Sequence, residues 1–415
     1  MNNIAIGASA RARNDFALAV GFNSMASGNR SSAYGTDSKA SNLHSSAFGV
    51  SSSASGNAST AYGDSSKAAG DNSVAFGFSA NAVGGSSVAA GASATANGPV
   101  SVAIGFVPFA EDAAIALGDH ARAGATNVIA IGPQSTAGNH AASSSSPGND
   151  AIAIGHNAST LNPQTRLGAD SAIAIGKTAR ADGSQGTAVG PGTRASAANS
   201  VALGNSATAG GGDSIAFGHN ASTLDPNTKV GKVAAMALGP STISSGQGSI
   251  AVGPGAKATG DAALAIGDGA GAAQTGALAI GLGAQAGPGV NAIAIGTNTI
   301  ATNSVAVGAA AMASNGGAAY GDGASATGSL ATALGPNAST TAANAVAIGS
   351  GSVANEANSV SVGASGNARR ITNVAAGIAA ADAATVGQLA NVQAQIEDLR
   401  KEYGLPVRNA HANGE

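Results

Sequence analysis

Apolar and small residues alternate along most of this chain in a five-residue stretch that recurs at a fixed interval. In Ser-Val-Ala-Ile-Gly at residues 101–105, Val102 and Ile104 fall on one side of an extended segment, and Ala103 falls on the other. The glycine that closes the stretch recurs every fourteen residues, at Gly7, Gly21, Gly35, Gly49, Gly63, Gly77, Gly91 and Gly105. A short strand repeated at a constant period predicts an all-β solenoid.

A second, shorter strand is predicted five residues after each closing glycine, where an alanine recurs, as at Ala96 and Ala110. Glycines such as Gly84 and Gly98 then let the backbone turn. Each coil would therefore hold two strands and two turns. We expect Val and Ile of the first strand to interleave with Ala of the second inside the coil. Parallel pairing at about 4.8 Å would stack roughly two dozen coils into a rod of about 120 Å.

The other side of the first strand carries mostly Ala and Ser, and we expect this flat outward face to suit close approach of another chain. Four aromatic residues precede closing glycines in consecutive coils: Tyr34, Phe48, Tyr62 and Phe76. We interpret them as a ladder of stacked interior rings, because solenoids stack like residues. An aromatic strip that binds a ligand is the alternative.

Three stretches interrupt the period and predict loops, near residues 141–149, 156–170 and 219–233. The last two resemble each other, and insertions in a solenoid often form its binding face. Their matching candidate contact residues are His156, Asn157, His219 and Asn220. No carboxylate or second histidine accompanies either histidine at ligand spacing, so a polar turn residue is a better interpretation than a metal site. Insertions that are merely tolerated are the alternative to contact loops.

Composition narrows the class of protein. Among 415 residues there are 62 glycines, 3% aromatic and 9% charged residues, which suits neither an ordinary globular core nor a disordered chain. A net charge of -3 gives no footprint for nucleic acid, and the absence of cysteine excludes thiol chemistry. Serines lack repeated His and acidic partners, and no glycine run ends in Gly-Lys-Ser/Thr. We expect no catalytic site, cofactor or metal, and no enzyme activity.

The fourteen-residue repeat ends near residue 366, and the residues that follow have a different pattern. Residues 367–385 are irregular, and Asp382 is the expected N-cap of a helix over 386–403, followed by a flexible tail over 404–415. The helix carries a heptad seam at Leu389, Val392, Ile396, Leu399 and Tyr403. This seam predicts a coiled coil but does not choose between two and three strands.

The repeats, the Ile-Thr-Asn-Val-Ala-Ala-Gly segment at 371–377 and the seam, in that order, resemble the head, neck and stalk start of YadA-like trimeric autotransporter adhesins. The resemblance covers nearly the whole chain. It assigns the neck to 367–385, where the motif positions are Ile371, Asn373, Val374, Gly377 and Asp382.

The resemblance implies a left-handed parallel β-roll in each of three identical subunits, with a neck that passes each chain across to a neighbour. It further implies a head displayed on the bacterial cell surface, anchored in the outer membrane. The partners it implies are host extracellular-matrix or cell-surface proteins, or like heads on other cells. From the pattern at residues 1–4 and the lengths of the apolar runs, we expect neither an export signal nor a membrane anchor in this sequence. We therefore expect export and attachment to use segments outside it.

Two other functions fit parts of the pattern. A phage-like tail fibre segment would also be a trimeric rod and would need no export signal. A solenoid that binds ice or calcium would need ranks of Thr-x-Thr or Gly-Gly-x-Gly-x-Asp, and neither array is present. A non-enzymatic adhesin head is the leading interpretation.

Overall fold

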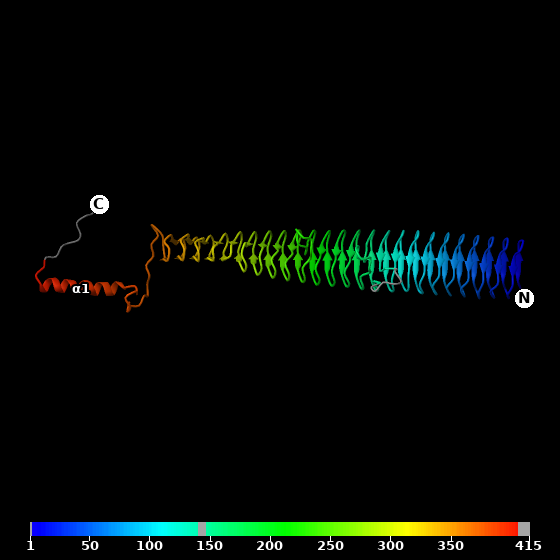
Figure 1. The fold of residues 1–415 in the computed structure, drawn as a ribbon, viewed down its shortest axis with the longest axis horizontal. Coiled ribbons are helices and arrows are strands. Elements are labelled where there is room, and N and C mark those ends of the chain that lie inside the picture. Colours follow the sequence, from blue (N-terminus) through cyan, green and yellow to red (C-terminus); the bar gives the residue numbers. More distant parts are fainter. Residues whose placement is uncertain (1, 140–146, 406–415) are drawn as a thin grey trace.

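The computed structural model describes residues 2–139 and 147–405. It is a parallel β-solenoid that forms a long rod, with the N-terminus at one end and a helix beyond the other (Figure 1). The first strands of the coils, from β1 (Ile4–Ile6) to β47 (Val360–Ser361), form one 25-stranded parallel sheet, which we call sheet A. At about 4.8 Å per strand, sheet A is about 115 Å long.

The second strands form sheet B on the opposite side of each coil, in runs of ten, three and nine strands. These runs extend from β2 (Arg11–Ala12) to β20 (Thr136–Ala137), from β23 (Arg180–Ala181) to β27 (Thr208–Ala209), and from β30 (Ile243–Ser244) to β46 (Val353–Ala354). Single parallel bridges through Ser159 and Ser222 connect the runs. The interruptions coincide with the two similar insertions.

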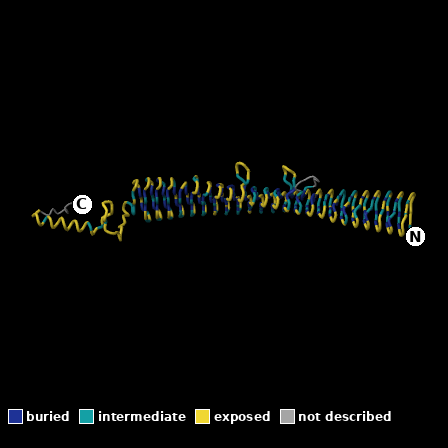
Figure 2. Tube along the Cα trace, turned by 60° about the horizontal axis from the view of Figure 1, so that its bottom comes forward, coloured by how far each residue is buried: buried dark blue, intermediate teal, exposed yellow. Residues whose placement is uncertain are grey.

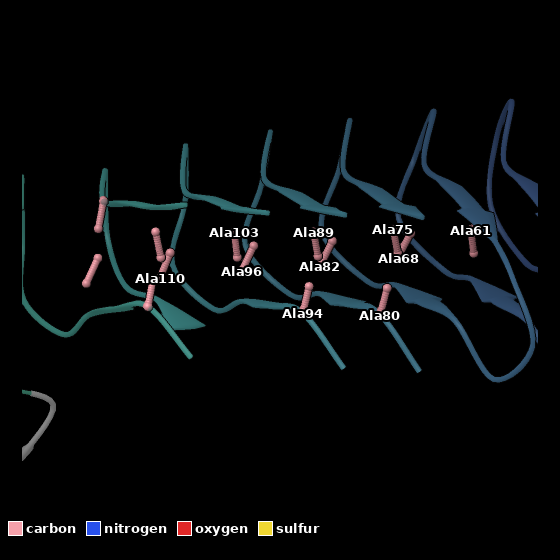
Figure 3. Packing of buried hydrophobic residues seen from close by; sticks show 14 of the residues in the cluster. Ala61, Ala68, Ala75, Ala80, Ala82, Ala89, Ala94, Ala96, Ala103 and Ala110 are labelled. Carbon is pink, nitrogen blue, oxygen red and sulfur yellow. The ribbon is translucent and has the colours of Figure 1, made fainter. Parts of the chain in front are cut away.

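The interior of the coils is filled mostly by alanine and serine. In β15 (Val102–Ile104), Ala103 is buried, whereas Ile104 is 43% exposed. In β16 (Phe109–Ala110), Ala110 is buried and Phe109 lies outward. The alanines of the two strand layers meet inside the coil (Figure 3). The prediction that Val and Ile fill the interior is therefore wrong, and so is the expectation of an outward face of Ala and Ser.

The thinness of the coil explains this reversal. Only small side chains fit between two strand layers joined by tight turns, so each first strand turns its larger residues outward. Most buried serines also have partners in the turns: the Ser101 hydroxyl, for example, donates to the Gly98 carbonyl at 2.6 Å. Because a buried hydroxyl without a partner destabilises a protein, serine suits a position that faces a turn carbonyl.

The turns repeat at half the period of the coil. A residue with left-handed backbone occurs every seven positions, as at Ser93, Val100 and Val107, with φ between 53° and 56°. The sequence predicts that Gly84 lets the backbone turn. In the structure, Gly84 instead allows the next coil to approach closely. A Cβ at Gly84 would lie 1.9 Å from the carbonyl oxygen of Gly98 in the next coil.

After β47 the chain is irregular until α1 (Val386–Glu402). This helix has no buried residues in the single chain that the structure describes. Within residues 2–139 and 147–405, no helix combines the length and apolarity that a membrane span requires.

Candidate interaction surfaces

The outer face of sheet A carries two parallel columns of side chains, because the first and third residues of each strand point outward. We call this double column the A face. Its strands pair in register, so Val102 lies beside Ile115 and Ile104 beside Leu117. The columns are mostly Val, Ile and Leu from β1 to β45 (Val346–Ile348). An apolar surface that runs the length of the molecule is a candidate interaction surface.

The aromatic ladder belongs to the A face. Tyr34 and Phe48 are stacked with ring centroids 5.2 Å apart and an interplanar angle of 11°. Tyr62 and Phe76 repeat this geometry. Tyr62 is 53% exposed and Phe76 is 55% exposed. The predicted stacking is thus confirmed within these two pairs, whereas Phe48 and Tyr62 are tilted by 39° to each other. The predicted interior position is wrong.

Small residues accompany most of these rings. The outward partners of the first three rings in their own strands are Ser32, Ser46 and Thr60. Over these three coils, a large ring in one column of the A face therefore lies beside a small side chain in the other column. The A face keeps its two columns here but changes its shape.

The two similar insertions form matching β-hairpins, which project from the same side of the rod (Figure 2). Hairpin 1 (residues 161–168) is closed by an antiparallel bridge between Leu161 and Gly168, and hairpin 2 (residues 224–231) by one between Leu224 and Gly231. The tip of each hairpin begins with the same kind of turn, in which a side-chain oxygen accepts from two backbone N–H groups. Asn162 Oδ1 accepts from the backbone N–H groups of Gln164 and Thr165 in hairpin 1.

In hairpin 2, Asp225 Oδ1 replaces the amide oxygen. It accepts from the backbone N–H groups of Asn227 and Thr228, each at 2.8 Å. The bond from Thr228, followed by that from Asn227, lowers the pKa of Asp225. Hydrogen bonds to the ionised carboxylate favour its charged form. The two hairpins therefore share a shape but differ in charge.

An ion-pair cluster around a buried carboxylate anchors hairpin 1. Arg180 and Arg194 each donate to the Asp182 carboxylate at 3.0 Å, and the Asp182 side chain is 1% exposed. Arg180 also donates to the Leu161 carbonyl at 3.2 Å. Sequence reasoning missed this cluster, because neither the wide spacing of the three residues nor any motif signals it.

Hairpin 2 has no counterpart of this cluster among the described residues. Ile243 occupies the place of Arg180, and Ser245 the place of Asp182, each sixty-three positions later. The buried Ser245 hydroxyl has no hydrogen-bond partner. A surface hollow of about 310 Å³ lies beside hairpin 2, lined in part by Leu224, Pro226 and Ile243. The two hairpins thus differ in how firmly they are held.

The four predicted contact residues lie in turns that precede the hairpins. Asn157 and Asn220 have left-handed backbone, with φ of 55° and 56°. His156 contacts Asn157, with Nδ1 and Nδ2 3.3 Å apart, and Asn220 lines the hollow beside hairpin 2. The structure does not bring His156 and His219 together, because four coils, about 19 Å, separate them.

In the described ranges, no group of three His, Asp or Glu side chains is placed to hold a metal ion. The predicted loop near 141–149 lies mostly outside the described residues. At its described end, the Pro147 carbonyl accepts from the Asn139 N–H at 2.7 Å.

Arg369 attaches the neck segment to the last coils. Its guanidinium donates to the Ser352 hydroxyl at 2.7 Å and to the Val362 carbonyl at 2.8 Å, and it also contacts the Ser350 carbonyl. Beyond it, Ile371 is 69% exposed, and Asn373 adopts a left-handed backbone. Ile371 therefore leaves most of its apolar side chain exposed in the single chain.

Gln388 and Thr385 fix the start of α1. The Gln388 amide bonds both the N–H and the carbonyl of Gly377, and Thr385 and Gln388 form a capping box. Thr385 is therefore the N-cap, and the prediction of Asp382 in that role is wrong. The Thr-x-x-Gln spacing was the available sequence signal.

Asp382 closes a separate turn before the helix. Its carboxylate accepts from the backbone N–H groups of Ala379 and Ile378, which lower its pKa. Val374 is 42% exposed beside this region. The five predicted neck residues thus lie on one irregular segment between the rod and α1.

The predicted seam of α1 is exposed along its length. Leu389, Val392, Ile396, Leu399 and Tyr403 are between 46% and 70% exposed. A short helix with an exposed apolar seam needs partner helices for stability. The seam and the A face therefore both present apolar surface that a single chain leaves open.

Comparison with known families gives two matches. Residues 370–411 match the coiled stalk of trimeric autotransporter adhesin. The YadA head domain repeat, taken two copies at a time, matches fourteen segments that together span more than half of the chain: 4–24, 26–52, 40–66, 54–80, 82–106, 112–135, 168–193, 195–221, 232–256, 244–270, 258–284, 272–299, 326–352 and 341–365.

Among solved structures, the chain is similar to the collagen-binding domain of the Yersinia adhesin YadA. The identity is 31%, the alignment covers 45% of this chain and 84% of that domain, and the TM-score is 0.26. No curated protein matches the chain.

Proposed function

This chain belongs to the YadA-like trimeric autotransporter adhesins, and on that premise we propose that three copies join through their A faces and helix seams into a rod that attaches to host matrix. The chain is an adhesin head followed by the start of a stalk. Adhesins of this family are surface-exposed outer-membrane proteins. The role we propose is structural and adhesive rather than catalytic.

The A face is the observation that carries this proposal. Its double column places apolar side chains at the surface of nearly every coil, and burying them would yield about 25 cal/mol per Å² of apolar surface. Neighbouring coils contribute similar residues, so the interface would be continuous along the rod. The number of three rests on the family, because the seam alone does not choose it.

We propose that the turns and hairpins on sheet B carry contacts to the ligand. They lie away from the A face and remain available after assembly. His156 and Asn157 at one insertion, and His219 and Asn220 at the other, would recur three times around the rod. Three copies of a weak patch act at high effective concentration, which increases avidity. The neck residues would join the rod to the stalk in each subunit.

Collagen is the first matrix protein to test, because the similar Yersinia domain is described as collagen-binding. The purified chain would be passed over immobilised collagen, fibronectin and laminin. A double-deletion variant would lack residues 161–167 and 224–230, which returns both insertion coils from twenty-one to fourteen residues. We expect binding to at least one matrix protein, and loss of that binding in the variant.

Circular dichroism and solution mass would show that the shortened rod keeps its fold and assembly. Retained binding in the variant would refute the contact role of the hairpins. Absence of binding to all three matrix proteins would refute the matrix attachment.

A further inference from the structure

The first residue of each sheet B strand points outward, so these residues form a single column on the side of the rod opposite the A face. We call this column, over the first nine coils, the B column. Its strands pair in register from β2 to β18 (Arg122–Ala123). Its members are Arg11, Met25, Lys39, Ser53, Lys67, Asn81, Thr95, Phe109 and Arg122.

Charge is segregated along this part of the rod. The B column holds four cations, Arg11, Lys39, Lys67 and Arg122, and no acidic residue, although the whole chain has a net charge of -3. The four cations are exposed, and none makes an ion pair within the described ranges. The B column is thus a positive stripe on a slightly acidic molecule.

Apart from Glu111, the acidic residues of these coils lie in the turns. Asp37 accepts from the Asn23 amide at 2.6 Å, and Asp71 accepts from the Asn57 backbone N–H at 2.7 Å. Glu111 lies just after β16, where it accepts from the Asn97 amide at 2.9 Å. These hydrogen bonds hold the three carboxylates against neighbouring coils, and the strand positions of the B column itself carry only basic and neutral side chains.

The spacing of the cations suits a linear ligand. Arg11, Lys39 and Lys67 occupy every second coil, which places their backbones about 9.6 Å apart. Eight strand spacings, about 38 Å, separate Arg11 from Arg122. A flexible polymer with an anion in each repeating unit could contact several of these cations at once.

A surface hollow at the Arg122 end of the B column could hold a sugar ring. It has a volume of about 230 Å³, and its lining includes Thr95, Phe109, His120 and Arg122. The Arg122 guanidinium lies 5.6 Å from the centre of the Phe109 ring. An aromatic surface, a hydroxyl and a guanidinium together match a sugar ring that carries an anion: the apolar side of the sugar against Phe109, and its anion against Arg122.

We propose that the first nine coils bind a linear anionic polysaccharide, sulfated or carboxylated, which lies along the B column with one sugar in the hollow at Phe109. The proposal rests on the proposed function only in that assembly through the A face leaves the B column exposed. A single chain carries the whole site, so polysaccharide binding and assembly can fail independently.

The test is isothermal titration calorimetry with a heparin oligosaccharide and a hyaluronan oligosaccharide of equal length, at low and at physiological salt. The column variant carries R11S, K39S, K67S and R122T, substitutions to residue types that the B column already contains. The control variant carries R166S, K177S, K229S and K232S, which remove the same charge from turns and hairpins of later coils. A third variant, Phe109→Thr, tests the hollow.

We expect binding to at least one polysaccharide, weakened about tenfold or more in the column variant and less than about twofold in the control. Binding should weaken with salt, because exposed charges are screened. Preference for hyaluronan would assign the anion as carboxylate, whereas preference for heparin would assign a sulfated polymer of higher charge density. Phe109→Thr should weaken binding several-fold, and unchanged affinity would remove the hollow from the site.

Three results would overturn the proposal. The first is no binding to either polysaccharide at low salt. The second is an equal loss in the column and control variants, which would indicate net charge alone. The third is equally tight binding of poly-glutamate of matched charge, which would indicate that no sugar is recognised.

Discussion

Gly49 and Gly63 lie so close in successive coils that a Cβ built on Gly49 would be 2.4 Å from the carbonyl oxygen of Gly63. Gly49 also has a φ of +129°, a conformation that L side chains rarely adopt. The same relationship holds between Gly63 and Gly77. The fourteen-residue period therefore has a steric cause: only glycine allows one coil to approach the next at this corner.

Gly49→Ala should destabilise the rod by at least about 2 kcal/mol, because it adds backbone strain and a clash with the next coil. Thermal unfolding followed by circular dichroism would measure the effect. Gly255→Asn is the matched control, since a Cβ there meets no atom within 4 Å and its φ of +64° suits asparagine. Equal melting temperatures for the two variants would contradict the steric account.

Ala103→Leu should destabilise the rod by about 2–3 kcal/mol, because Ala103 is fully buried in a coil with no room for three more carbons. Denaturation with urea would measure the loss. Val102→Leu, one position earlier and on the A face, should cost far less. If Val102→Leu proved the more harmful in a dissociated single chain, the assignment of inner and outer positions would be wrong.

Asp182→Ala should loosen hairpin 1 at a cost of about 1–3 kcal/mol, because Arg180 and Arg194 lose the carboxylate that holds them. Trypsin should then cleave faster after Arg166 in hairpin 1, while cleavage after Lys229 in hairpin 2 serves as an internal reference. Ser245→Ala, at the matching place, should change neither rate. Unchanged cleavage at Arg166 in Asp182→Ala would show that the cluster does not hold the hairpin.

The tip of hairpin 2 should respond to acid, and that of hairpin 1 should not. The pKa of Asp225 is lowered in the folded chain, so its bonds to Thr228 and Asn227 are intact above the ordinary value of 3.8 and are lost as the pH falls below it. Backbone amide NMR signals of these two residues should shift in this range. Those of Gln164 and Thr165, which bond to the neutral Asn162, should remain constant.

Asp225→Asn should abolish the titration of the Thr228 and Asn227 signals while keeping the turn, because the asparagine would copy Asn162 of hairpin 1. A titration that persists in this variant would assign the pH response to another group.

The period and the strand positions could be predicted from the sequence, because the closing glycines and the alternation at residues such as Val102 and Ala103 mark them directly. The inward and outward sides could not, since alternation defines two faces but not which one is buried. The thickness of the coil determines which face is buried: the interior of a fourteen-residue coil has room for Ala103 and Ala110 but not for Ile104. The usual association of larger apolar residues with an interior was misleading here.

The candidate surfaces were less predictable. The insertions at His156 and His219 were visible as a lengthened period, but the cluster of Arg180, Asp182 and Arg194 forms only when coils stack. The B column was also hidden, because its cations are dispersed among turn residues in the sequence. A helix start at Asp382 was a reasonable expectation, yet the Thr385–Gln388 capping box determined it.

The central claim, that the apolar A face joins three chains, is tested most directly by the solution mass of the purified chain from multi-angle light scattering. We predict three times 38.6 kDa at both low and high concentration. Ile131→Asp, which places a charge on the A face, should lower the mass toward that of one chain, whereas Thr136→Asp on sheet B of the same coil should not. A stable mass of 38.6 kDa for the unmodified chain would contradict the account.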